Sequence, residues 1–164
     1  NKPPMIRIVT LPIIMITLIV MIIVALIWIT GCSKEAVSEE DFPPIMTGMV
    51  VVNEQEYEMK AGNFKWERQV GFNTEIVRTD AAAPNQLAES YEPISVQQNE
   101  SILIEIEGDP NIDIFLWDAD GPAEEVKQTD NQIAAHADSG RYIYEALATW
   151  PKGEVSYTFV VKVD

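Results

Sequence analysis

The sequence predicts an all-β domain, an antiparallel sandwich of two sheets, over residues 45–164. Three observations support this prediction. Apolar and polar residues alternate over many short stretches, as in strands that bury one face. Turn-forming residues separate these stretches at a spacing of about 8–12 residues. No stretch after residue 44 has the length and period of a long amphipathic helix. Because each such strand buries one face only, two sheets must cover each other.

The individual strands follow from this alternation and from runs of β-branched residues. In chain order they are predicted at residues 49–52, 55–60, 64–70, 74–78, 94–97, 101–107, 112–117, 141–150 and 155–163. Asn53-Glu54 and Ala61-Gly62-Asn63 are predicted as turns, and Gly71 is expected to end a strand. Residues 125–128 and 132–135 are short and weakly patterned. Residues 80–93 form a long loop with room for one helical turn, and we expect it to be the longest candidate binding loop.

Asp138-Ser139-Gly140-Arg141-Tyr142 is the sharpest local motif of the domain. It resembles the D-x-G-x-Y tyrosine corner of immunoglobulin-like domains. The resemblance implies an immunoglobulin-like topology in which Tyr142 opens the penultimate strand and its hydroxyl bonds to nearby backbone. Tyr144 stands where antibody domains carry a cysteine, so their inter-sheet disulfide is absent. Trp117 is only loosely similar to their buried tryptophan.

A charge-free apolar run of 24 residues, from Ile8 to Gly31, precedes the domain. Lys2 and Arg7 come before it, and its length would also suit a spanning helix. The run ends in Ile29-Thr30-Gly31-Cys32, which matches the lipobox, in which small residues flank the scissile bond and a cysteine thiol receives a diacylglyceryl group. We therefore expect cleavage between Gly31 and Cys32 and lipidation of Cys32, the single cysteine of the chain.

From Cys32 onward the chain resembles the small lipoproteins of Gram-positive bacteria. The stretches that carry this resemblance are residues 62–66, 79–87 and 140–163. The lipobox and the composition predict a signal peptide over residues 1–31 and a lipidated cysteine with an acidic spacer over 32–44, held in the cell membrane by fatty acyl chains such as palmitate. The resemblance implies no particular activity. An uncleaved signal anchor stays open as an alternative. Both readings place the domain on the extracytoplasmic face, because positive charge stays inside.

The charge of the chain excludes one class of partner. It has 11 basic and 26 acidic residues, for a net charge of −15. Such a surface repels phosphates, so we expect no nucleic-acid binding. A solvated surface and attraction of cations or a cationic partner both remain open.

The candidate chemical groups favour binding over catalysis. Asp118-Ala119-Asp120-Gly121 lacks the spacing of a calcium loop and is predicted as a turn. His136 is the single histidine, and no G-x-S-x-G motif accompanies it. We therefore predict no catalytic residue, no metal and no cofactor. Aromatic residues could form the core or a stacking platform; they include Trp66, Trp117, Trp150, Tyr142 and Tyr144. The expected function is an interaction module for a protein or cell-wall component. An accessory cation-sensing or structural lipoprotein is the alternative, and a cell-envelope hydrolase has the weakest support.

Overall fold

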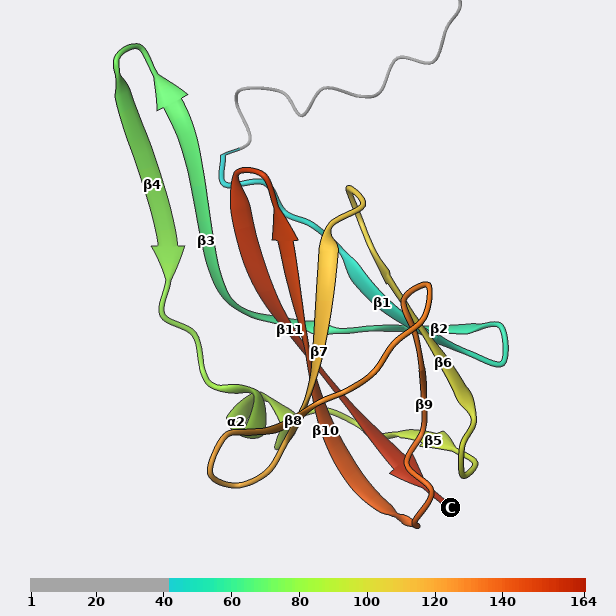
Figure 1. Cartoon of the computed structure of the whole chain (residues 1–164). Coiled ribbons are helices and arrows are strands. Elements are labelled where there is room, and N and C mark those ends of the chain that lie inside the picture. The colour runs from blue at the N-terminus through green and yellow to red at the C-terminus, as the bar shows by residue number, and fades with distance from the viewer. Residues whose placement is uncertain (1–41) are drawn as a thin grey trace, which may run out of the picture. The chain divides into compact units, whose positions relative to one another are not determined.

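A computed structural model describes residues 42–164, and nearly all of their regular structure is β (Figure 1). The strands are β1 (Gly48–Val52), β2 (Gln55–Glu58), β3 (Lys60–Val70), β4 (Asn73–Thr79), β5 (Ile94–Val96), β6 (Ser101–Ile106), β7 (Asn111–Trp117), β8 (Pro122–Glu125), β9 (Gln132–Ala134), β10 (Gly140–Trp150) and β11 (Gly153–Val163). One short helix, α2 (Pro84–Ala88), follows β4. The prediction of an all-β domain is confirmed.

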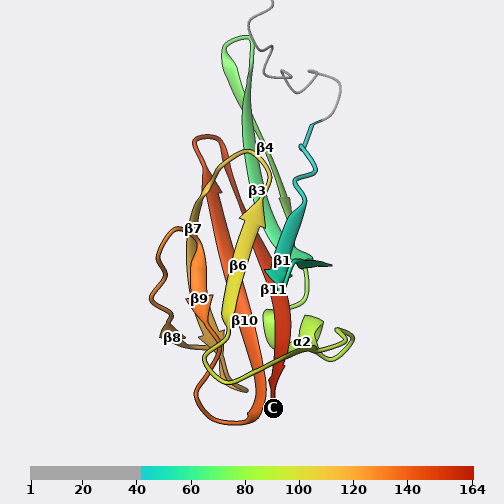
Figure 2. The same cartoon turned by 90° about the vertical axis from the view of Figure 1, so that its right-hand side faces the viewer.

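The strands form two sheets that pack face to face (Figure 2). The small sheet has the order β2-β1-β6-β9. The large sheet has the order β4-β3-β11-β10-β7-β8, with β5 paired to the end of β11. The apolar faces of both sheets meet in one core, as the alternation in the sequence requires. Val50, Ile102 and Ile104 come from the small sheet, and Ile114 and Phe159 come from the large one.

Strand β11 is buried on both of its faces, since residues 155–161 are all buried. One face meets the small sheet, and α2 packs against the other. Arg141 fastens this cover, because its Nη2 donates a hydrogen bond of 2.7 Å to the carbonyl oxygen of Ala88. Pro84 suits the first turn of α2, where a backbone N–H has no helical acceptor. The predicted long loop therefore acts as a third layer over the middle of the large sheet.

The predicted turn at Ala61-Gly62-Asn63 is wrong, because these residues lie inside β3. Gly62 lies at a close approach rather than at a chain reversal. A Cβ there would lie 3.2 Å from Leu87 Cδ1, in the cover that α2 provides. The chain instead passes between the two sheets around Met59, whose N–H donates to the carbonyl oxygen of Gly48 over 2.8 Å.

One strand pair departs from a purely antiparallel arrangement. Strand β3 pairs with β11 from Gly153 to Thr158 and then leaves it after a bulge. The edge that this exposes on β11 is taken by β5, which runs parallel to it with Val161 opposite Ile94. Every other strand pair among the described residues is antiparallel.

Phe42, three residues before the expected boundary at Ile45, packs on the domain, since its ring centroid lies 4.4 Å from the guanidinium carbon of Arg68 on β3. The predicted signal peptide, the Gly31–Cys32 cleavage site, the lipidated Cys32 and the spacer up to residue 41 lie outside the described residues. Within residues 42–164, no helix has the length and hydrophobicity to cross a bilayer.

Candidate functional site

The β3–β4 hairpin projects beyond the rest of the domain (Figures 1 and 2). The last β3 residue that pairs with β11 is Trp66, opposite Gly153. The N–H of Glu67 still donates to the carbonyl oxygen of Lys152 in the β10–β11 turn over 2.8 Å, and beyond Glu67 β3 pairs with β4 alone, up to Val70 opposite Asn73. At about 3.3 Å per residue, this two-stranded end extends roughly 15 Å past its neighbour. Gly71 closes the turn with a φ of 62°, a conformation that favours glycine.

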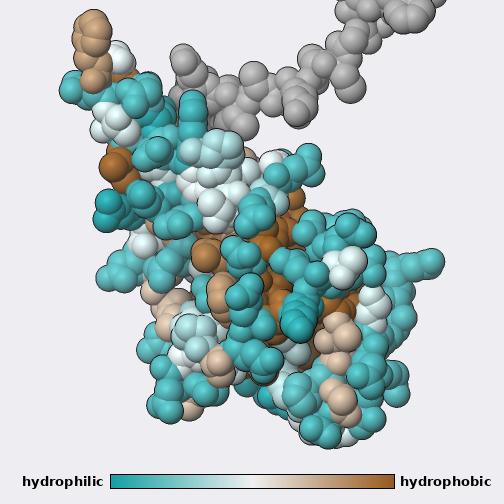
Figure 3. All heavy atoms as spheres, in the orientation of Figure 1, coloured by the Kyte–Doolittle hydropathy of each residue, from teal (hydrophilic) through white to brown (hydrophobic). Residues whose placement is uncertain are grey.

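The end of this hairpin is apolar. Four large apolar side chains are exposed among the described residues: Ile45, Val70, Phe72 and Ile76. Phe72 has an exposed fraction of 105%, so its ring touches almost nothing in the domain. Ile45 belongs to the 42–47 segment, which lies at the same end of the domain as the hairpin (Figure 1). In Figure 3 a hydrophobic group caps the end of the projection, and the surface just below it is mostly hydrophilic.

The hairpin also differs from the rest of the domain in charge. Residues 60–79 contain four basic and two acidic side chains, whereas the remainder of 42–164 contains four basic and 20 acidic ones. Lys65 lies directly opposite Arg78 in the β3–β4 register and opposite Glu154 in the β3–β11 register. Arg68 pairs with Glu75 over 2.7 Å on the other face of the ribbon.

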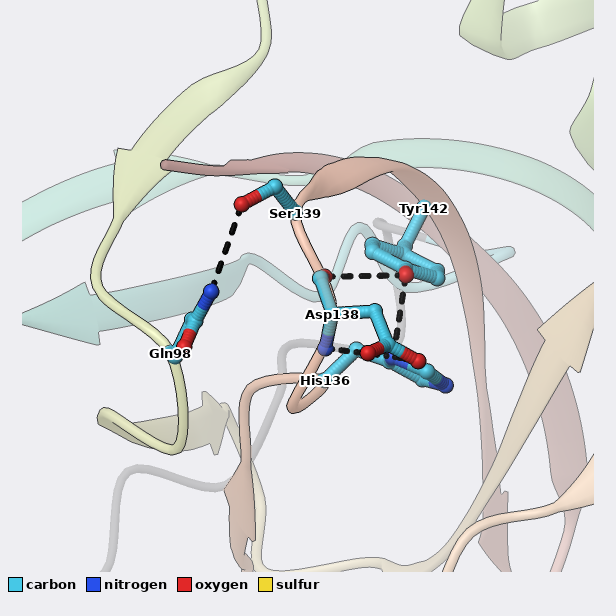
Figure 4. A network of polar contacts seen from close by, with 5 residues as sticks. All are labelled: Gln98, His136, Asp138, Ser139 and Tyr142. Atoms are coloured by element: carbon cyan, nitrogen blue, oxygen red, sulfur yellow. Dashed lines mark hydrogen bonds and ion pairs between the residues drawn. The ribbon is translucent and has the colours of Figure 1, made fainter.

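The tyrosine-corner motif lies at the opposite end, in the β9–β10 loop and the start of β10 (Figure 4). The Tyr142 hydroxyl donates to the carbonyl oxygen of Asp138 over 3.0 Å, which is the kind of backbone bond such a corner makes. Gly140 is required because a Cβ there would lie 3.3 Å from the Tyr142 ring. Ser139 Oγ accepts a hydrogen bond of 3.3 Å from Gln98 Nε2, which links this loop to the one before β6.

His136 is part of the same corner. Its ring stacks on Tyr142 with the centroids 4.4 Å apart. Its Nδ1 accepts the backbone N–H of Asp138 over 3.1 Å and lies 2.9 Å from the Tyr142 hydroxyl. Nδ1 therefore carries no proton in this arrangement, and the ring proton is on Nε2. The Ser139 hydroxyl bonds to Gln98 and not to the His136 ring. His136, Asp138 and Tyr142 therefore form a structural network without a serine nucleophile beside the imidazole.

The acidic loops are also structural. Asp118 Oδ1 accepts the backbone N–H groups of Asp120 and Gly121 over 2.7 and 3.1 Å, so this carboxylate holds the turn that the sequence predicts. Asn111 Nδ2 donates to Asp113 Oδ2 over 3.4 Å. Within residues 42–164, no three Asp, Glu, His or Cys side chains lie close enough together to hold a metal ion.

Sequence reasoning missed a polar ladder on the large sheet. Glu145 accepts hydrogen bonds from Trp117 Nε1 over 2.7 Å and from Ser156 Oγ over 2.5 Å. These three side chains come from β7, β10 and β11, on the face turned away from the small sheet. The available signal was an acidic residue in the middle of a strongly apolar strand.

The remaining aromatic residues divide between core and surface. Trp66 and Tyr144 are buried, and Trp66 packs against Trp150 with ring centroids 5.1 Å apart. Trp150 is half-buried and borders a shallow hollow of about 190 Å³ together with Lys65 and Lys152. Burial, together with the nearby Glu58 and Tyr57, raises the pKa of Tyr91 to about 12. Its hydroxyl donates to the carbonyl oxygen of Glu58 over 3.0 Å, which is a structural role.

The chain was compared with protein-family models, with characterised proteins and with solved structures, and none of them matches it.

Proposed function

We propose that the chain is a membrane-anchored extracytoplasmic lipoprotein and that its sandwich is an interaction module rather than an enzyme. The observation that carries this proposal is the order Ile29-Thr30-Gly31-Cys32 at the end of an apolar run. Cys32 is only ten residues before Phe42, and Phe42 packs on the domain. A domain that starts this close to Cys32 would be displayed directly on the outer membrane surface.

The role of interaction module is supported by the use of the polar side chains. The groups that could serve catalysis are engaged in structural hydrogen bonds, as described for His136, Ser139, Asp118 and Glu145. The 20 acidic residues outside the hairpin favour a partner with positive charge, either a protein or a wall component.

An immunoglobulin-like topology is part of the proposal. Its support is the hydrogen bond from the Tyr142 hydroxyl to Asp138 and the place of Tyr142 in β10, the strand that precedes β11. A crystal structure in which the Tyr142 hydroxyl does not bond to the Asp138 backbone would remove this support.

Mass spectrometry of the chain from bacterial membranes tests the anchor. The expected result is a mature chain that begins at Cys32 and carries a diacylglyceryl thioether on its sulfur. Cys32→Ala should accumulate as the uncleaved chain. A mature chain with an unmodified Cys32 thiol would contradict the proposal.

Binding to living cells tests the module. The labelled wild-type ectodomain should bind saturably to cells that lack the chain, unlabelled protein should compete, and raised salt should weaken binding because the interaction is electrostatic. Turnover of a wall-derived substrate that is lost in His136→Ala would instead favour the hydrolase alternative.

A further inference from the structure

We propose that the β3–β4 hairpin is a second membrane contact, whose Phe72 tip enters the headgroup region of an anionic bilayer and orients the domain. This inference rests on the proposed membrane attachment of the N-terminal segment. The proposal assigns an interaction surface to the β3–β4 hairpin, which has no role in the N-terminal anchor itself.

The first argument is the placement of the apolar side chains. All four large apolar side chains exposed within residues 42–164 lie in the hairpin or in the 42–47 segment at the same end of the domain. Val70 is next to the turn that carries Phe72 and has an exposed fraction of 51%, whereas Ile76 lies farther back on β4, opposite Glu67, and has an exposed fraction of 46%. Amphipathic elements that lie on membranes bury their apolar residues roughly 5–10 Å deep. A projection of roughly 15 Å can reach that depth while the sandwich remains in water.

The second argument is charge complementarity. The hairpin carries four basic against two acidic residues, whereas the rest of the domain is strongly acidic. Lys60 lies at the far end of β3, where its Nζ donates to Ser90, and Arg68 in the projecting part is paired with Glu75. Lys65 and Arg78, at the base of the projection, are therefore the basic residues placed to meet the lipid surface. An anionic bilayer attracts basic residues near its surface and repels the acidic body. The two effects act together and turn the hairpin toward the membrane. Lys65 and Arg78 are cross-strand partners, with Glu154 on the other side of Lys65, and both would interact favourably with lipid phosphate groups.

The third argument is the path of the tether. Nine residues, 33–41, separate Cys32 from Phe42, and fully extended they reach about 35 Å at most. Phe42 lies against Arg68, so the tether leaves the domain at the base of the hairpin. A membrane anchor at or before Cys32 therefore keeps the base of the hairpin within about 35 Å of the lipid surface.

A fluorescent probe on the hairpin tip tests the proposal. Phe72→Cys is made in the full chain with Cys32→Ser and labelled with the polarity-sensitive dye NBD. The chain is then reconstituted through its apolar run 8–31 into phosphatidylcholine vesicles that contain phosphatidylglycerol. Ser139→Cys is the matched control, because the β9–β10 loop lies at the other end of the domain (Figures 1 and 4). This design needs no lipidation of Cys32, so an unmodified Cys32 in bacteria would not affect the outcome.

The expected result is a blue-shifted emission of the probe at 72, quenched by lipid-borne quenchers, with no shift of the probe at 139. Vesicles of phosphatidylcholine alone, or added salt, should reduce the shift. Lys65→Gln with Arg78→Gln should weaken the lipid contact by about fivefold per charge, from roughly 1 kcal/mol for each basic residue near an anionic surface. An uncharged variant that keeps the full shift would overturn the electrostatic part.

Two other outcomes would overturn the proposal. If the chain floats with the vesicles but the probes at 72 and 139 have the same emission, the hairpin does not touch lipid, and the proposed attachment still stands. If the probe at 72 is shielded only on native membranes that contain protein, the tip binds a protein partner instead. A chain that does not float with the vesicles would contradict the proposed attachment together with this inference.

Discussion

Strands β3 and β11 have the same length of 11 residues and are neighbours in the large sheet, yet their surroundings are opposite. Residues 155–161 of β11 are buried on both faces. In β3, full burial ends at Trp66, and the strand continues into a ribbon in which β4 is its only strand partner, with Phe42 packed on Arg68 near the base. The comparison shows that the strand-forming residues of two strands do not decide which strand is buried. The neighbouring strands and layers decide which part of the sheet is buried and which part is exposed for binding.

The sharpest contrast is between two phenylalanines. Phe159 on β11 has an exposed fraction of 0% and stacks on Tyr144 with ring centroids 5.1 Å apart, whereas Phe72 is fully exposed. Phe159→Ala should therefore lower the free energy of unfolding by about 3–5 kcal/mol. Phe72→Ala should change it by less than about 0.5 kcal/mol. Urea denaturation measures both, and equal costs would break the comparison.

Two glycines sharpen the contrast through backbone geometry. A Cβ at Gly153, where β11 begins, would lie 2.1 Å from the Cε3 atom of the buried Trp66 ring. Gly153→Ala should cost about 3 kcal/mol because this ring must move. Gly71 at the hairpin turn has open space around it and a φ of 62°, so Gly71→Ala should cost only about 1 kcal/mol from backbone strain. Thermal unfolding should give a lower Tm for Gly153→Ala than for Gly71→Ala. A Gly153→Ala variant that is more stable than Gly71→Ala would contradict the close packing of Gly153 on Trp66.

Alkaline pH tests the buried side of the large sheet. Burial, with a smaller contribution from Tyr142, raises the pKa of Tyr144 from 10.0 to about 12. Below pH 10 this tyrosine is protonated in both the folded and the unfolded chain. Between pH 10 and 12 the unfolded chain loses the proton first, so the free energy of unfolding falls by on the order of 2 kcal/mol. Comparison of wild type with Tyr144→Phe over this range isolates the effect, and parallel curves would show that Tyr144 ionises normally.

The smallest expected effect concerns carboxylates in the two regions. Glu145 accepts hydrogen bonds from Trp117 and Ser156, so Glu145→Gln should cost about 1 kcal/mol. Glu75 forms an ion pair with Arg68 on the exposed ribbon, and Glu75→Gln should cost less than about 0.5 kcal/mol. Chemical denaturation of both variants in the same buffer provides the comparison. A larger loss in Glu75→Gln would mean that the ribbon is more tightly held than its exposure indicates.

The fold class could be predicted because alternation survives wherever one face of a strand is buried. It is clear in β6, where Ile102, Ile104 and Ile106 share the inner face. The prediction failed at Gly62, because a glycine that lies close to Leu87 inside a strand cannot be told from a turn glycine by its sequence neighbours. The parallel β5–β11 pair was also beyond prediction, since it depends on where β3 leaves β11.

The features of the candidate site were harder to predict. The motif around Tyr142 carries its own local geometry, so its residues could be named from the sequence. Phe72 could not be assigned to the surface, because its exposure follows from the absence of a partner strand beyond Trp66. The charge contrast between residues 60–79 and the rest of the domain was present in the sequence and becomes visible only when the hairpin is recognised as one unit.

The position of β11 has a consequence for the order in which the domain can form. It is the last strand in the chain order and lies between β3 and β10 in the middle of the large sheet. Ribosomes make the chain from its amino end, so β3 has no β11 to pair with while residues 71–152 are added. The sandwich cannot close during that interval, because the central strand of the large sheet is made only with residues 153–163.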